Sequence, residues 1–152
     1  MAGYDDDLRF AHVLADAADA ASLDRFRARD LAVVTKIDRT PVTEADQTVE
    51  ERIRTTLGRA RPRDAILGEE FGSTGNSPRC WVIDPIDGTE NYLRGVPAWA
   101  TLIGLMVGDE VVAGHQIVTA ARAHDRVRQL DESGRTLALE QAAPSLDPGV
   151  RL

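Results

Sequence analysis

The residues best suited to chemistry are acidic, and their densest group follows a short apolar run. In WVIDPIDGTENY (residues 81–92), Asp84 and Asp87 stand three positions apart, directly before Gly88 and Thr89. Glycine allows a tight turn whose backbone N–H groups face a ligand, and paired carboxylates supply the oxygen ligands that Mg²⁺ prefers. Taken alone, the same residues are also typical of a structural turn after a buried strand.

Two further acidic segments precede this motif. Glu69 and Glu70 follow Gly68 at the end of another apolar run, and Asp46 closes the segment PVTEAD at residues 41–46. The sequence contains one cysteine, Cys80, and its three histidines have no ligand spacing, so it offers no zinc site of the Cys/His type. The acidic residues therefore predict a site for a hard cation.

The apolar patterns predict the elements that would position these acids. Thr43 and Asp46 resemble a capping box at a helix start, with Asp in place of the usual Glu or Gln. Pro85 is expected to end the strand pairing before it. The expected helices span residues 5–30, 43–58 and 120–130, the expected strands 31–37, 65–67 and 80–83, and a hairpin joins 99–107 to 111–118, with a turn at 133–134. This mixture predicts an α+β domain.

Composition excludes several classes of partner. The 152 residues include 18 Lys and Arg against 25 Asp and Glu, a formal charge of −7, which is the wrong sign for binding nucleic acid through its phosphates. The apolar runs are too short for a membrane span, and the N-terminal segment lacks the pattern of a signal peptide. With a single cysteine, these features favour a cytoplasmic protein whose partners are cations or small molecules.

The three motifs in this order carry a resemblance. The chain closely resembles the inositol monophosphatase family of Mg²⁺-dependent phosphatases in the order of three segments, TKIDRTPVTEAD, GEE and WVIDPIDGTENY. Within that family, the segment NYLRGVPAWATLIGL is most similar to the histidinol-phosphate phosphatase branch. The match covers residues 35–113. It implies helices layered on a mostly antiparallel sheet, as in the N-terminal half of the inositol monophosphatase/fructose-bisphosphatase fold.

The resemblance also implies a metal site. Glu69, Asp84 and the backbone carbonyl of Ile86 would hold one Mg²⁺, and Asp84 and Asp87 would share a second. Family members use two or three ions.

Catalytic and substrate-binding roles follow from the same resemblance. Asp46 and the Thr89 hydroxyl would orient and help deprotonate the attacking water, and Glu69 would help to position it. The residues implied in phosphate and substrate binding are Asp87, Gly88, Thr89 and Glu90. Lys36 matches a basic residue near the family's site.

The resemblance leaves a second part of the family unmatched. Family members are longer and carry a further metal-binding aspartate in a Trp-Asp motif, which this sequence lacks. We therefore expect a phosphatase-like N-terminal domain over residues 1–114, a divergent or incomplete segment over 115–152, and an incomplete second metal site. Loss of the second sheet would leave an apolar strand face uncovered, which predicts a homodimer or another homo-oligomer.

Three functions remain open at this point. The first is Mg²⁺-dependent hydrolysis of a small phosphate monoester, histidinol phosphate or inositol monophosphate. The second is a truncated, catalytically deficient family member that binds metal or phosphate, or serves as a partner subunit. The third is a structural domain whose acids are turns and caps.

Overall fold

Helices and a mixed sheet alternate along the chain. The computed structural model describes residues 4–119, 127–130 and 136–138. In chain order the elements are α1 (Asp5–Arg25), β1 (Val33–Thr35), β2 (Pro41–Thr43), α2 (Glu44–Ala60), β3 (Ala65–Gly68), β4 (Gly72–Thr74), β5 (Arg79–Asp87), α3 (Thr89–Leu93), β6 (Trp99–Val107), β7 (Glu110–Thr119), β8 (Val127–Leu130) and β9 (Thr136–Ala138).

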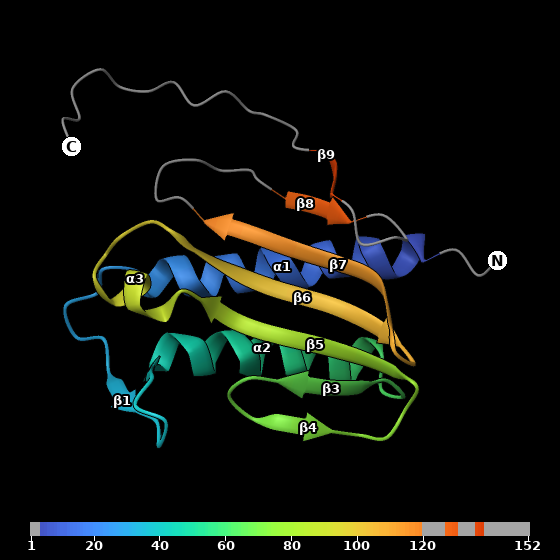
Figure 1. Cartoon of the computed structure of the whole chain (residues 1–152), viewed down its shortest axis with the longest axis horizontal. Helices are drawn as coiled ribbons and strands as arrows, with labels where there is room; N and C mark the ends of the chain where they lie inside the picture. Colours follow the sequence, from blue (N-terminus) through green and yellow to red (C-terminus); the bar gives the residue numbers. More distant parts are fainter. Residues whose placement is uncertain (1–3, 120–126, 131–135, 139–152) are drawn as a thin grey trace.

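Seven of the strands form one sheet in the order β4-β3-β5-β6-β7-β8-β9, and β1 pairs with β2 in a separate ribbon. All neighbours in the large sheet are antiparallel except β3 and β5, which run parallel. Figure 1 shows α1 and α2 on the same face of this sheet, α1 behind β6 and β7 and α2 behind β5. The expected α+β class with a mostly antiparallel sheet is confirmed.

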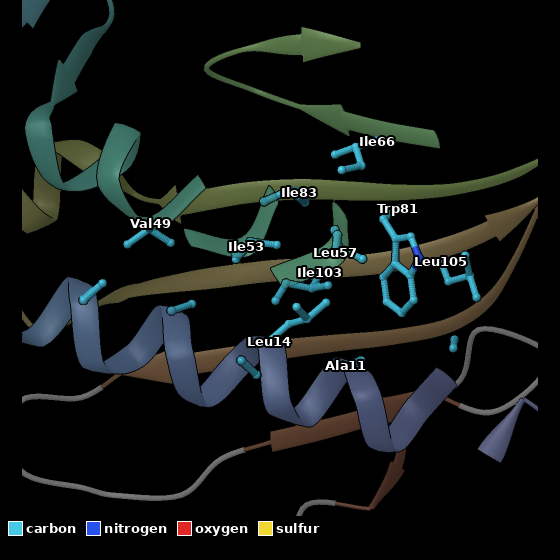
Figure 2. Packing of buried hydrophobic residues seen from close by; sticks show 14 residues of the cluster. Ala11, Leu14, Val49, Ile53, Leu57, Ile66, Trp81, Ile83, Ile103 and Leu105 are labelled. Atoms are coloured by element: carbon cyan, nitrogen blue, oxygen red, sulfur yellow. The ribbon is translucent and has the colours of Figure 1, made fainter. Parts of the chain in front are cut away.

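The main core lies between the two helices and the sheet. Helix α1 contributes a face of small residues, including Ala11, Ala15 and Ala18, which allows it to approach the strands closely. Helix α2 contributes larger side chains such as Ile53 and Leu57, which Figure 2 shows beside Ile83, Trp81 and Ile103 of the strands. This burial on one helix stripe and one sheet face is what holds the acidic strand ends in place.

Several expected elements are confirmed. The hairpin turns at Gly108, whose φ of 61° lies in the left-handed region that glycine tolerates, and joins β6 to β7. Thr43 and Asp46 form the capping box at the start of α2. The first helix ends at Arg25, before the expected boundary at residue 30.

Two expectations about local structure are wrong. Pro85 does not end β5, which continues to Asp87, because the strand bulges there and the missing N–H of proline costs no ladder bond. Val127–Leu130, placed in a helix by its sequence, is strand β8 and pairs with β7. The remainder of that expected helix, residues 120–126, and the expected turn at 133–134 lie outside the described residues.

Three short elements, β2, β4 and α3, were not predicted from the sequence. They have only three to five residues each, which is too short to show an apolar periodicity. The division of the chain at residue 114 stays a prediction. Strand β7 itself runs across this position, from Glu110 to Thr119.

Candidate active site

The acidic motifs lie at the ends of three elements: the end of β3, the end of β5 and the start of α2. Strands β3 and β5 are parallel, with Gly68 opposite Ile83, so the residues that follow, Glu69 and Asp84, emerge side by side. The N–H of Glu69 continues this pairing and donates to the carbonyl of Ile83 at 3.1 Å. Figure 1 shows α3 and the β1–β2 ribbon toward the same end of the sheet. The topology therefore brings together motifs that are far apart in the sequence.

A bulge in β5 places two of the acids on one face. Residues three positions apart point to opposite faces of a regular strand. Here Asp84 pairs with Leu102 and Asp87 with Ala100, so β5 has one residue more than β6 across this interval. Asp84 and Asp87 therefore share the face away from the helices. The buried hydroxyl of Thr101 donates to the Pro85 carbonyl at 2.8 Å and holds the bulge.

Asp46 is buried at the start of α2 with both of its oxygens engaged. Its Oδ2 accepts from the N–H of Thr43 at 2.7 Å and from the Thr43 hydroxyl at 2.5 Å. The Thr89 hydroxyl lies 3.2 Å from Oδ1 and 3.0 Å from the carbonyl oxygen of Ile86. Burial raises the pKa of Asp46, against the opposing effect of the hydrogen bonds from Thr43 and Thr89. Asp46, Thr89 and Ile86 thus form one connected group.

Lys36 joins two of the other acids. Its ammonium lies 3.2 Å from Glu69 Oε1 and 2.9 Å from Glu70 Oε1. The Glu70 side chain is buried, with 4% exposed, whereas 48% of the Glu69 side chain is exposed. Burial raises the pKa of Glu70, and the hydrogen bond from Lys36 opposes this change. Glu69 is thus the accessible acid of the pair, and Lys36 provides a positive charge at the site.

Asp84 is the most perturbed acid of the group. Its Oδ1 is buried and has no hydrogen-bond partner among the residues that the structure describes. Burial, the neighbouring Glu69 carboxyl, and the charges of Asp87 and Asp46 raise the pKa of Asp84 well above its usual range. An unpartnered buried carboxylate oxygen is costly unless a proton or a cation satisfies it.

The loop after β5 turns sharply at Gly88. This residue adopts a φ of 88° as the N-cap of α3, and a Cβ there would lie 3.1 Å from the carbonyl oxygen of Ala98. Asn91 donates to the same carbonyl at 2.9 Å, which ties the short helix to the chain before β6. Glu90 extends into solvent, 70% exposed, and lies 3.8 Å from Arg94. The turn thus brings Asp87, Gly88 and Thr89 to the site, whereas Glu90 contacts Arg94.

The donor set suits a hard cation, although its carboxylates do not converge as they stand. Among the described residues, no three His, Cys, Asp or Glu side chains are close enough together to hold one ion. The acids are nevertheless near enough for Glu69, Asp87 and Asp46 to raise the pKa of Asp84. A cation would relieve both the electrostatic repulsion at Asp84 and the lack of a partner at its Oδ1. The oxygen atoms present therefore fit Mg²⁺.

Sequence reasoning missed a buried pair beneath the site. Glu50 and Arg54 lie one turn apart on α2, and Glu50 is fully buried. The available signal was the position of Glu50 next to Val49 on the apolar stripe of the helix, where an unpaired glutamate is not expected.

In the part of the chain that the structure describes, no helix has the length and apolar character needed to cross a membrane. The described residues define an α+β domain with an acidic site at one end of its sheet. Residues 4–136 match the model of the inositol monophosphatase family, and the chain belongs to that family.

Its relatives include two with histidinol-phosphatase as their name. The Streptomyces coelicolor protein is 66% identical over 118 residues, which cover 78% of this chain and 44% of that protein. The Mycobacterium tuberculosis protein is 58% identical over 102 residues, covering 66% of this chain and 39% of that protein. The chain thus spans less than half the length of either relative.

Solved structures agree with the fold. The extragenic suppressor protein suhB of Bartonella henselae aligns with a TM-score of 0.73 at 28% identity, over 84% of this chain and 50% of that chain. The similarity extends through the helices and the mixed sheet, in agreement with the expectation that this chain resembles half of the family's fold.

Proposed function

We propose that the chain takes part in Mg²⁺-dependent hydrolysis of a small phosphate monoester, with histidinol phosphate as the first candidate and inositol monophosphate as the second. The observation that carries the proposal is the unpartnered, buried Oδ1 of Asp84 among neighbouring carboxylates. Two relatives named histidinol-phosphatase, at 66% and 58% identity, favour the first substrate.

The proposed ligands are all oxygen atoms. Glu69, Asp84 and the Ile86 carbonyl would hold one Mg²⁺, and Asp84 and Asp87 a second, less complete one. When bound, Mg²⁺ neutralises phosphate charge and lowers the pKa of water. The family's Trp-Asp aspartate has no counterpart in this sequence, so the second ion would depend more on water and phosphate as ligands.

The residues around the metal would move the proton and hold the phosphate. Thr89 Oγ1 and Asp46 Oδ1 lie within hydrogen-bonding distance and would orient the attacking water. The raised pKa of Asp46 makes it a better proton acceptor than an ordinary aspartate. The N–H groups of Gly88 and Thr89 would receive the phosphate at the start of α3, with Asp87 beside them. Glu90, which is exposed beside Arg94, would have to turn toward the substrate to take the binding role that the resemblance implies.

Phosphate release tests this function directly. We expect the chain to release phosphate from histidinol phosphate with Mg²⁺ and not without it, with inhibition by Li⁺, a property the family resemblance implies. Asp46→Asn should abolish most of this release, because it removes the proton acceptor. Asp109→Asn, at the exposed β6–β7 turn, removes an equal charge away from the site and is the matched control.

The alternative is a catalytically deficient family member that binds metal or phosphate, or serves as a partner subunit. Mg²⁺ binding by calorimetry without turnover would favour it. Absence of Mg²⁺ binding even with phosphate present would contradict both functions.

We also propose that the chain forms a homodimer or another homo-oligomer. Leu67 and Val111 are 43% and 47% exposed, on strands whose opposite face packs on the helices. Sheet faces with exposed apolar side chains gain free energy when a second chain covers them. Light scattering after size exclusion should give a mass of at least twice the monomer, and a well-behaved monomer would contradict this proposal.

A further inference from the structure

A charged residue is fully buried beneath the site, outside the residues given a role so far. Glu50 on α2 accepts at Oε2 from the N–H of Glu70 at 2.7 Å, and at Oε1 from the N–H of Phe71 at 3.1 Å. Arg54 Nε donates to the same Oε1 at 2.8 Å. A carboxylate is costly to bury unless its oxygens are bonded in this way. Glu50 thus binds the main chain of the turn that follows Glu69.

Arg54 extends this grip to the far side of the turn. Its Nη2 donates to the carbonyl of Gly72, and its Nη1 donates to the hydroxyl of Thr74 at 3.0 Å. The guanidinium also lies 6.0 Å from the centre of the Phe71 ring. The turn between β3 and β4 is therefore held by the helix at both ends. We call Glu50 and Arg54 the α2 clamp.

Gly68 provides the space that the α2 clamp needs. A Cβ at this position would lie 1.9 Å from Glu50 Oε1 and 2.9 Å from Arg54 Nη2. The backbone of Gly68 does not have a positive φ, so its conformation alone would accept another residue. The requirement for glycine comes from the buried carboxylate that fills the place of a side chain.

We propose that Glu50 is a positioning residue for Glu69. On one side, the N–H of Glu69 is fixed by the carbonyl of Ile83 on β5, and on the other the next two N–H groups are fixed by Glu50. The clamp thereby sets where the Glu69 carboxylate stands relative to Asp84, without itself touching metal or substrate. This inference rests on the proposed function, in which both acids bind the same ion.

The central test replaces Glu50 with glutamine in the full chain. Glutamine keeps the size of the side chain but loses the charge and one acceptor oxygen. Binding of Mn²⁺ in the presence of inorganic phosphate, measured by electron paramagnetic resonance, should weaken about tenfold, as for other residues that orient metal ligands. Hydrogen exchange at the amides of Glu70 and Phe71 should become faster in the metal-free chain.

Glu51→Gln is the matched control. Glu51 is the next residue on the helix, is exposed, and carries the same charge. We expect it to leave both Mn²⁺ affinity and the exchange of the two amides unchanged. Circular dichroism at the titration temperature verifies that each variant is folded.

Gly68→Ala perturbs the α2 clamp from the strand that it contacts, and this variant remains informative if Glu50→Gln does not fold. The added methyl group should displace the Glu50 carboxylate and weaken Mn²⁺ binding to a similar degree. In a Glu50→Ala background the carboxylate 1.9 Å away is gone and only the flexible end of Arg54, 2.9 Å away, has to shift. The additional effect of the methyl group on affinity should therefore be much smaller. Such non-additivity is the expected sign of a shared contact.

Two results would overturn the inference. If parent and Glu50→Gln chains bind Mn²⁺ equally well although the turn amides exchange faster, the clamp is structural only. Additive losses from Gly68→Ala in both backgrounds would show that Glu50 does not mediate the effect. If the parent chain itself binds no Mn²⁺ with phosphate present, the proposed function fails and this inference fails with it, which is a distinct outcome.

Discussion

Replacing Asp84 with asparagine is expected to stabilise the metal-free chain and, in the same protein, to abolish Mg²⁺ binding. Burial and the carboxyl of Glu69 raise the pKa of Asp84, so its charged form is unfavourable in the fold. Asparagine removes that charge with little change in size. After a discount for partial exposure to solvent, we expect a gain on the order of 2 kcal/mol at neutral pH, or about 5 °C in melting temperature.

The pH dependence of the same chain has a definite sign. The folded state holds the Asp84 proton more tightly than the unfolded state, so it binds more protons between the ordinary and the raised pKa. Stability of the metal-free chain from this group is therefore lost as pH rises through that window. Melting curves at about pH 5 and about pH 8 should differ less in Asp84→Asn than in the parent.

The Asp84→Asn variant is expected to lose affinity for the metal. Asparagine keeps one neutral oxygen but loses the charge that attracts Mg²⁺, so affinity should fall more than about a hundredfold, beyond the loss typical of residues that only orient ligands. Addition of Mg²⁺ and phosphate should raise the melting temperature of the parent and not of the variant. Asp109→Asn controls for net charge. A variant that melts below the parent without metal would contradict this account of Asp84.

The second large effect concerns the core. Trp81 is fully buried on β5, its ring packs edge-on against Phe10, and its Nε1 donates to Asp64 at 2.9 Å. Trp81→Ala leaves a cavity and removes one of the donors to Asp64, whose carboxylate then keeps its bonds from Arg79. It should lower the free energy of unfolding by about 3–5 kcal/mol. This is a large share of the about 5–15 kcal/mol of a typical domain. Urea denaturation followed by circular dichroism measures the loss.

Two variants separate the contributions at Trp81. Trp81→Phe keeps an aromatic ring and loses the N–H, so it should cost about 1–2 kcal/mol. Val34→Ala removes apolar atoms from a side chain that is 64% exposed and should stay within about 0.5 kcal/mol of the parent. Equal losses from Trp81→Ala and Val34→Ala would show that Trp81 does not hold the sheet to its helices.

Regular, amphipathic parts of the fold could be predicted from the sequence. The long helices have apolar residues at helical spacing, the β6–β7 hairpin has two apolar runs around Gly108-Asp109-Glu110, and the Thr43–Asp46 cap has a recognisable spacing. The prediction of a helix at Val127–Leu130 is wrong because the sequence of this short segment does not show that it pairs with β7. Pairing between distant segments decides such short elements, and a single sequence does not contain that information directly.

The candidate site was predictable only in part. The acidic motifs were visible as spacing, whereas the contact between Thr89 and Asp46 depends on how α3 meets α2. The place of Glu50 on the apolar stripe of α2 indicates burial, but not its partners, because these are backbone N–H groups and carry no sequence signature. The ligand roles of Glu69, Asp84, Ile86 and Asp87 stay predictions that the metal titrations address.

The bulge in β5 explains why the two aspartates are separated by two residues when one would place both on the same face of a regular strand. Carbonyl groups along a paired strand are engaged by their neighbour, but the extra residue of a bulge is released from that pairing. Here the carbonyls of Pro85 and Ile86 accept from the hydroxyls of Thr101 and Thr89 instead. A hydroxyl occupies only one lone pair of a carbonyl oxygen. The longer spacing thus lets a strand present a neutral main-chain oxygen between two acidic ones.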